Sequence, residues 1–374
     1  MNENEFNKKF DESYEEKKPD FENHINIAVI GKVSSGKSSL INAILGRERS
    51  DPLAEVGAIS GVTTKVTAYR LDKQVLIVDS PGLNDVRQEN SIETKNFINS
   101  IDLGLFVVTE SADDSQKANF DDLKKSCQEV FVVLNKIDMW DEFDQSEYDS
   151  VLNQWKSVLG VSKIYGTCSK GYNPKFRPDA PMDLRGINEL KRDIFSFLDK
   201  DGKSLLLARH LKNKETYALR IIALALASVA VEAFIPGSAA YITSTQILAI
   251  TSLNYLYTGE VLSKSNALSL LPTFAGESIG MTVFLWTKSV LPPTGIIDAA
   301  AAVVAVTITF AMLSAVKWVL LKGYNLDQKD MLGEAFKEFK TIGIDLKNIS
   351  LSDFDFNNID AIIELVSKLI DKKA

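Results

Sequence analysis

The chain has 374 residues, which is enough for two or three domains, and its formal net charge is −8 at pH 7. This acidic balance, without an evident basic face, argues against non-specific binding to nucleic-acid phosphates, so no nucleic-acid partner is expected. Neither Cys127 nor Cys168 belongs to a metal-binding pattern, and no secretory signal is visible near residue 1.

Residues 1–23 are predicted to form a charged N-terminal arm. Within residues 1–20 Asp and Glu alternate with Lys, and no sustained apolar face is visible. Such a segment is either a frayed charged helix or a disordered arm, and the simplest interpretation is a solvated tail.

Residues 31–38 read Gly-Lys-Val-Ser-Ser-Gly-Lys-Ser and form the most informative motif of the chain. Two glycines separated by four residues and followed by Lys and Ser fit the phosphate-loop pattern. The β-branched run at 25–30 predicts a buried strand before the loop, and residues 39–45, closed by Gly46, predict a helix after it. This context predicts a nucleoside triphosphate site; the alternative is a glycine- and serine-rich turn without a ligand.

The residue types of this phosphate loop suit triphosphate chemistry. Gly31 and Gly36 let the backbone turn tightly. The N–H groups of the loop and of the helix start, including those of Ser35 and Ser39, can then point at phosphate oxygens. Lys37 is predicted to reach the β- and γ-phosphates, which makes it a candidate catalytic residue.

Magnesium and the γ-phosphate have further candidate partners. Ser38 is predicted to place its hydroxyl on Mg²⁺. The apolar run at 75–78 predicts a second buried strand, which leads into Asp79-Ser80-Pro81-Gly82. Asp79 can hold Mg²⁺ through water, and the Gly82 N–H can sense the γ-phosphate.

A third buried run, residues 130–134, ends in Asn135-Lys136-Ile137-Asp138. The carboxylate of Asp138 can accept two parallel hydrogen bonds from the N1–H and N2–H₂ groups of guanine, a pair that adenine does not offer. Residues 164–170 form a predicted short strand and loop that can cover the base. The predicted ligand is therefore GTP or GDP.

These motifs, in this order, resemble the Ras-like (TRAFAC) superfamily of P-loop GTPases over residues 25–198. The resemblance implies an α/β fold for residues 24–199, with a mainly parallel sheet and helices on both faces. It implies that Lys136 stacks along the base, that Asn135 ties back to the phosphate loop, and that Ser169 and Lys170 belong to the base loop. It further implies GTP hydrolysis to GDP and phosphate with Mg²⁺ as cofactor.

The loop between the first helix and residues 65–70 contains Thr63 and Thr64. A threonine here can complete the Mg²⁺ shell when GTP is bound and release the loop after hydrolysis. The resemblance assigns this metal and catalytic role to one of the two, and Thr64 is favoured. The alternative is that both threonines only lead into a strand.

The sequence lacks the glutamine that orients the attacking water in Ras, because Leu83 follows Gly82 at that position. Turnover is therefore expected to be slow unless self-association or a partner completes the site. Ser34, the fourth residue of the phosphate loop, matches dynamin-like GTPases. That resemblance implies a monovalent cation, K⁺ or Na⁺, at a homodimer of GTPase domains; the alternative is a simple turn hydrogen bond from Ser34.

The composition changes after residue 199, and residues 200–330 are predicted to form a highly apolar, all-α domain. The segments 233–259 and 299–316 carry no charged residue, and the second is about the minimum length that spans a bilayer. Two interpretations remain open. These are core helices whose polar residues, such as Gln246, need partners, or they contact or enter a membrane, with lipid as a partner.

This half resembles the YcjF-like domain of unknown function that often follows a Ras-like domain in bacteria, through Ile235-Pro236-Gly237 and Leu291-Pro292-Pro293. Its plan is also similar to that of immunity-related GTPases. In the C-terminal tail, residues 331–374, apolar residues recur at helical spacing between Ile359 and Ile370, which predicts a helix packing on the bundle.

Three functions are compatible with these features. The first is a GTP-hydrolysing switch whose nucleotide state controls the helical domain. In this function the protein is associated with a membrane and dimerises through its GTPase domain. The second is a membrane-acting effector that GTP binding gates with little turnover. The third, which the acidic charge disfavours, is a ribosome- or RNA-assembly GTPase. The expected location is the cytoplasm, including peripheral or integral attachment at the cytoplasmic face of a membrane.

Overall fold

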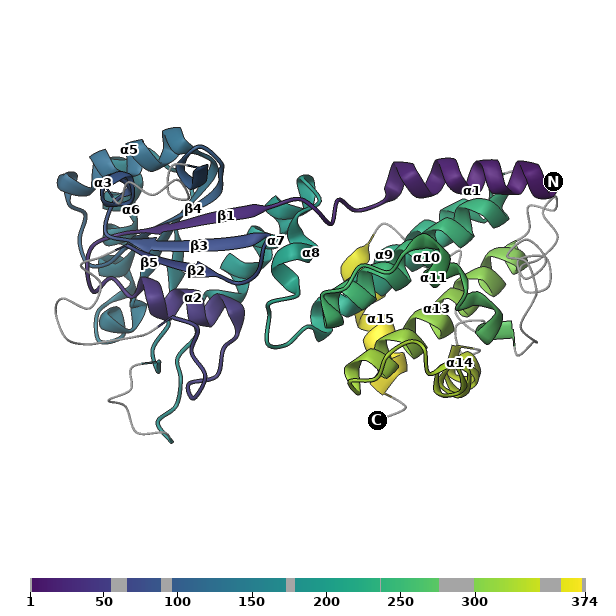
Figure 1. Cartoon of the computed structure of the whole chain (residues 1–374). Coiled ribbons are helices and arrows are strands. Elements are labelled where there is room, and N and C mark those ends of the chain that lie inside the picture. Colours follow the sequence, from purple (N-terminus) through teal and green to yellow (C-terminus); the bar gives the residue numbers. More distant parts are fainter. Residues whose placement is uncertain are drawn as a thin grey trace. The chain divides into compact units, whose positions relative to one another are not determined.

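The computed structural model describes residues 2–54, 66–88, 96–172, 179–235, 237–275, 299–343 and 358–371. It divides into two compact units (Figure 1). One is Glu22–Lys212, and the other combines Met1–Phe21 with Asn213–Ala374. The first is an α/β unit and the second is helical. The predicted boundary at residue 199 lies too early, because the buried residues Leu205–Leu207 and the hydrogen bond from Lys212 N–H to Leu45 O belong to the α/β unit.

The α/β unit is built on one six-stranded sheet with the order β2-β3-β1-β4-β5-β6. The strands are β1 (Ile25–Ile30), β2 (Thr67–Arg70), β3 (Val75–Ser80), β4 (Ile101–Val108), β5 (Cys127–Asn135) and β6 (Tyr165–Thr167). Only β2 runs antiparallel to its neighbour, and every other pair is parallel. Parallel strands need cover on both faces, which explains the continuous apolar runs.

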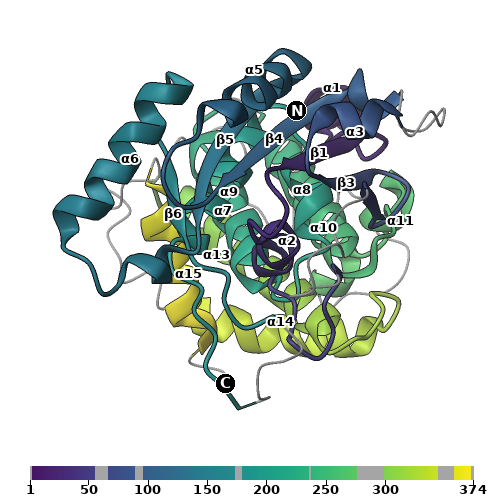
Figure 2. The ribbon, with the colours of Figure 1, turned by 90° about the vertical axis from the view of Figure 1, so that its left-hand side faces the viewer.

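Helices cover both faces of this sheet, as expected (Figure 1, Figure 2). Side chains alternate along β1, so Ala28 and Ile30 join one core and Ile27 and Val29 line the other. The first face packs against α3 (Leu83–Gln88), α5 (Lys117–Ser126) and α6 (Gln145–Leu159). The second packs against α2 (Lys37–Leu45), α7 (Ile187–Lys200) and α8 (Ser204–Ala208).

The motif residues all lie at or just after the carboxyl ends of strands. The phosphate loop follows β1, Asp79 lies near the end of β3, Asn135 ends β5, and residues 168–170 follow β6. Because these strands are parallel, their carboxyl ends meet at one edge of the sheet, the usual ligand edge of such folds.

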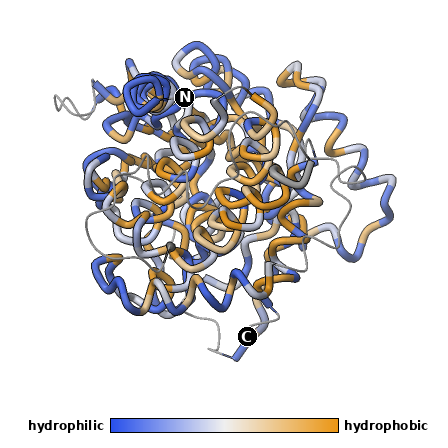
Figure 3. The backbone as a smooth tube through the Cα atoms, turned by 90° about the vertical axis from the view of Figure 1, so that its right-hand side faces the viewer, coloured by the Kyte–Doolittle hydropathy of each residue, from blue (hydrophilic) through white to orange (hydrophobic). Residues whose placement is uncertain are grey.

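The helical unit contains α9 (Glu215–Glu232), α10 (Ser238–Thr258), α11 (Lys264–Leu268), α13 (Ala299–Leu321), α14 (Lys329–Gly343) and α15 (Ile359–Asp371). Figure 3 shows how hydrophobic residues run along these helices. Among the described residues one segment, Ala302–Leu321, is long and apolar enough to cross a membrane, and 83% of it is buried inside the unit. It packs against α9, α10 and α14.

Some of the polar side chains inside this unit find partners. Gln246 Nε2 donates to Thr309 Oγ1 at 2.8 Å, and Thr245 Oγ1 donates to Glu232 Oε1 at 2.8 Å. Lys317, 3% exposed, donates to Glu215 at 2.6 Å. The core-helix interpretation therefore accounts for these contacts without a membrane. It leaves Gln246 Oε1 and the hydroxyls of Ser244 and Thr307 without a hydrogen bond among the described residues.

The C-terminal tail packs as predicted. Ile362, Val366 and Leu369 of α15 are buried, and α15 contacts α9.

The expectation of a solvated N-terminal arm is wrong. Residues Glu3–Lys17 form α1, which begins at a capping box between Asn2 and Glu5 and packs against α10. Phe6, Phe10 and Tyr14 are buried, each at most 4% exposed. Three aromatic residues spaced by four make a narrow apolar stripe, which the surrounding charges concealed in the sequence.

We predict that α1 stabilises the helical unit. Replacing Phe6 and Phe10 by Ala should lower the free energy of unfolding of this unit by about 3–5 kcal/mol per site, because both rings are buried. Urea unfolding followed by circular dichroism measures the effect, with Asn7→Ala and Lys8→Ala on the exposed face of α1 as the matched control. An unchanged unfolding midpoint in the Phe variant would contradict the prediction.

Candidate nucleotide site

The phosphate loop lies tightly against the ends of two strands. A Cβ atom on Gly31 would stand 2.1 Å from the carbonyl oxygen of Val107, and one on Gly36 would stand 2.4 Å from Asn135 Nδ2. Gly36 also adopts a φ of 86°, in the left-handed region. Neither position has room for a side chain, so both glycines are required by their close neighbours as well as by the conformation of the loop.

Lys37 is held in the interior at the start of α2, with 2% of its surface exposed. Its ammonium group donates to Gly31 O at 2.9 Å and to Lys32 O at 3.2 Å, and it lies 3.7 Å from Asp79 Oδ1. Burial lowers the pKa of Lys37 and raises the pKa of Asp79, although each charge favours the other. A buried pair of this kind is costly without further compensation.

The expected magnesium ligands lie together. Ser38 Oγ donates to Asp79 Oδ2 at 2.7 Å, while Asp79 Oδ1 is fully buried and accepts no hydrogen bond from the described residues. Hydroxyl and carboxylate oxygens are the ligands that Mg²⁺ prefers, so these two residues fit the ion. Thr63 and Thr64, the expected third contribution, lie outside the described residues.

Asn135 joins the phosphate loop to the base loop, as expected. Its Nδ2 donates to Ser35 O at 3.0 Å and approaches Gly36 O at 3.4 Å. Its Oδ1 accepts from Thr167 Oγ1 and Ser169 Oγ, both at 3.2 Å. The side chain is 1% exposed, so this amide fixes two loops at once.

Asp138 lies in the short helical turn Ile137–Trp140 that follows β5. Its carboxylate already has partners: Lys170 Nζ donates to Oδ2 at 3.0 Å, and the Cys168 thiol approaches Oδ1 at 3.4 Å. Burial raises the pKa of Cys168 to about 12, so the thiol keeps its proton. Lys136 has a φ of 63° immediately before this turn, which shapes the chain around the base position.

Sequence reasoning missed the residues that hold the base loop in place. Arg185 forms paired hydrogen bonds with Asp141 at 2.7 Å and also bonds to Asp183, whose backbone pairs with that of Lys170. Gly186 is as tightly fitted, because a Cβ there would stand 1.9 Å from Gly166 O. Neither residue belongs to a pattern that a single sequence reveals.

The remaining predicted residues differ in their exposure. Ser35 is buried, and its hydroxyl finds no partner among the described residues. Ser39 is half-buried in the first turn of α2. Gly82 is buried, and its carbonyl accepts from Ser80 Oγ at 2.7 Å.

Leu83 and Ser34 bear on hydrolysis. Leu83 is fully buried in the core against α5 and α6, so it cannot touch a water molecule in the site. Ser34 is exposed, with a φ of 67° that is uncommon for a residue other than glycine.

Comparison with known proteins agrees with this geometry. Residues 26–136 match the family described as 50S ribosome-binding GTPase. GTPase Der of Sulfurimonas denitrificans is 31% identical over 212 residues, which are 53% of this chain and 40% of that protein. The tRNA modification GTPase MnmE of Aliarcobacter butzleri is 34% identical over 137 residues, or 34% of this chain and 30% of that protein.

GTPase Era of Caldanaerobacter subterraneus subsp. tengcongensis is 26% identical over 209 residues, which cover 52% of this chain and 65% of that protein. The chain thus spans less than two thirds of the length of each of these relatives. The residues matched to the family lie wholly within the α/β unit, which has the P-loop GTPase fold.

Proposed function

We propose that this protein binds GTP and hydrolyses it to GDP and phosphate, with Mg²⁺ as cofactor. The carrying observation is the buried arrangement of Lys37, Ser38 and Asp79 beneath the phosphate loop. The negative charge of a triphosphate would compensate the buried ammonium of Lys37, which burial otherwise disfavours.

The residues divide the work of this reaction. Water attacks the γ-phosphorus, and the bond from that phosphorus to the bridging oxygen of GDP breaks. Lys37 and the loop N–H groups stabilise the negative charge on the phosphate oxygens. Bound Mg²⁺, held by Ser38 and Asp79, would neutralise further charge.

Guanine selection falls to Asp138. Its two carboxylate oxygens would exchange the contacts with Lys170 and Cys168 for the N1–H and N2–H₂ groups of the base. An adenine base would leave the carboxylate without this pair, which costs affinity.

We predict that Asp138→Asn changes base preference. An asparagine amide can donate to the 2-carbonyl of xanthine but not to the 2-amino group of guanine, so affinity for GTP should fall by about 100-fold while affinity for xanthosine triphosphate rises. Titration with fluorescent nucleotides measures both constants. Asp149→Asn, on the exposed face of α6, is the matched control and should retain GTP preference. Equal weakening of both nucleotides would contradict this role.

Slow intrinsic hydrolysis, raised by self-association and a monovalent cation, is the second part of the proposal. Two observations support it: Leu83 is buried and cannot orient water, and Ser34 is exposed at the mouth of the loop. A hydroxyl there is available to a K⁺ or Na⁺ ion at a homodimer of GTPase domains.

We predict that Ser34→Gly lowers the cation-dependent turnover by about tenfold, because it removes the hydroxyl but keeps the left-handed backbone conformation unstrained. Phosphate release is measured against protein concentration in K⁺, Na⁺ and choline buffers. Ser162→Gly, in the exposed loop before β6, is the matched control. A wild-type turnover per molecule that is independent of protein and cation concentration would overturn the dimer model.

The nucleotide state is proposed to control the helical unit, with Thr64 as the candidate sensor of bound Mg²⁺. This is the switch function. In the alternative, GTP binding alone gates the helical unit and turnover is incidental. The likeness of this unit to the YcjF-like domain and the immunity-related GTPases supports a two-part plan and names no reaction.

A membrane partner, at the cytoplasmic face, is a second candidate that one observation favours. Leu224 and Val231 lie seven residues apart on one face of α9 and are 44% and 63% exposed. Phe234 and Ile235, just after the helix, are also exposed, at 46% and 41%. Large apolar side chains exposed this close together in the sequence support an apolar partner if they form one patch. The apolarity of α13 needs no membrane, since the unit buries it.

A ribosome or RNA partner is the third candidate. The matched family is described as ribosome-binding, and a relative is named for tRNA modification. These descriptions stand against the expectation, drawn from net charge alone, that nucleic acid has no part in the function.

We predict that the full chain floats with anionic liposomes when bound to a non-hydrolysable GTP analogue and less so with GDP, and that Leu224→Ser with Val231→Ser reduces flotation several-fold. Exposed Lys8→Ser is the matched control. Recovery with sedimenting ribosomes, and not with liposomes, would favour the third candidate. The protein could instead be recovered in the membrane fraction with either nucleotide and be extracted only by detergent. That result would contradict nucleotide-dependent switching.

A further inference from the structure

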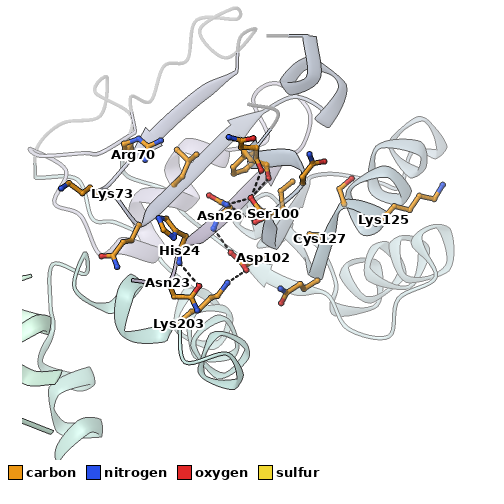
Figure 4. A pocket seen from close by; sticks show the side chains of 18 residues that line it. Asn23, His24, Asn26, Arg70, Lys73, Ser100, Asp102, Lys125, Cys127 and Lys203 are labelled. Carbon is orange, nitrogen blue, oxygen red and sulfur yellow. Dashed lines mark hydrogen bonds and ion pairs between the residues drawn. The ribbon is translucent and has the colours of Figure 1, made fainter. Parts of the chain in front are cut away.

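A polar groove of about 800 Å³ lies at the amino-terminal edge of the sheet, within the α/β unit (Figure 4). It is lined where β1, β3, β4 and β5 begin and by the turn between β2 and β3. The nucleotide motifs follow the opposite, carboxyl ends of the same strands. Six residues of β1 separate the two edges, a span of about 20 Å at roughly 3.3 Å per residue, so the groove cannot be part of the nucleotide site.

The groove is positively charged although the chain is acidic overall. Arg70, Lys73, Lys125 and Lys203 line it from separate segments of the chain. Figure 4 shows Arg70 and Lys73 on one side and Lys125 on the other, with Asp102 between them. No other acidic side chain of the described residues lines the groove.

The one acidic residue is already satisfied. Asp102 is 4% exposed, accepts from Lys203 Nζ at 2.6 Å and accepts from the Asn26 backbone N–H at 2.9 Å. Its charge is therefore balanced inside the wall of the groove. Lys73 and Lys125 are exposed and form no ion pair with any described residue, which leaves their charges for a ligand.

The neutral lining suits a polar ligand too. Carboxamides of Asn96, Asn99 and Gln128 face the groove beside the hydroxyl of Ser100. Asn26 Nδ2 donates to Ser100 O at 3.0 Å and to Ser100 Oγ at 2.8 Å, and these hydrogen bonds fix this part of the wall. The described lining offers no exposed Phe, Tyr or Trp ring on which a base could stack, so recognition would rest on charge and hydrogen bonds.

We propose that this groove is a second anion site, which binds a phosphorylated ligand with several negative charges through Lys73, Lys125 and Arg70. Its volume lies in the range of about 300–1,000 Å³ that holds nucleotide-sized molecules, and its polar lining disfavours an apolar ligand. Phosphate groups are the shared chemistry, and they can come from a small phosphorylated metabolite or from the backbone of an RNA strand. The inference is independent of GTP hydrolysis.

The test is calorimetric titration of the full chain with inorganic tripolyphosphate, in excess Mg²⁺ and with saturating GDP to occupy the phosphate loop. The titration is repeated with Lys37→Ala, which weakens binding of tripolyphosphate to the phosphate loop. Binding seen in this variant therefore belongs to the groove even if GDP does not occupy the loop. We expect one binding event in both proteins, with a binding constant that falls as salt concentration rises. Lys73→Glu with Lys125→Glu should weaken this event by at least about tenfold.

The matched control is Lys124→Glu with Lys156→Glu, which changes the net charge equally on lysines of the same unit that do not line the groove. It should retain binding, and thermal melting checks that both variants fold. A second series with a short single-stranded RNA identifies the source: tighter RNA binding that the groove variant abolishes assigns the phosphates to RNA, and its absence assigns them to a small molecule. No binding event with the loop occupied, or equal loss in both variants, overturns the proposal.

Discussion

The burial of Lys37 beside Asp79 is the constraint on which the nucleotide site depends. The Lys37 side chain is 2% exposed, and its nitrogen donates to two backbone carbonyls and lies 3.7 Å from the Asp79 carboxylate, contacts that offset part of the cost of burying its charge. Asp79 in turn has one oxygen that accepts no hydrogen bond from the described residues. The arrangement is therefore organised before the ligand arrives, and the electrostatic gain comes when phosphate and Mg²⁺ supply the missing partners.

That arrangement needs a rigid frame, which the parallel sheet provides. Gly31 abuts Val107 of β4 and Gly36 abuts Asn135 of β5, so the loop contacts strands beyond the one it follows. Asn135 then connects the loop to Thr167 and the base-recognition segment. The base loop is thus linked to the phosphate loop through one buried amide.

Much of this site was predictable, because its residues act through local spacing. The phosphate loop, Asp79, Asn135 and Asp138 each follow an apolar run that is readable as a strand, and parallel strands bring such ends together. Arg185 was not predictable, since its partner Asp141 lies on a separate segment. The aromatic stripe of α1 was missed for another reason: only the fold shows that α10 offers it a surface.

Net charge gives little information on such a groove, because it averages over surfaces that a ligand never meets together. The chain carries −8 overall, yet four cationic residues and a single neutralised aspartate line one groove. Local potential, and not the total, determines which anions bind, and at physiological salt it acts over about 8 Å. An acidic chain can therefore hold a phosphate-binding surface wherever folding gathers its lysines, and the opposite edges of one sheet here carry two such surfaces of different design.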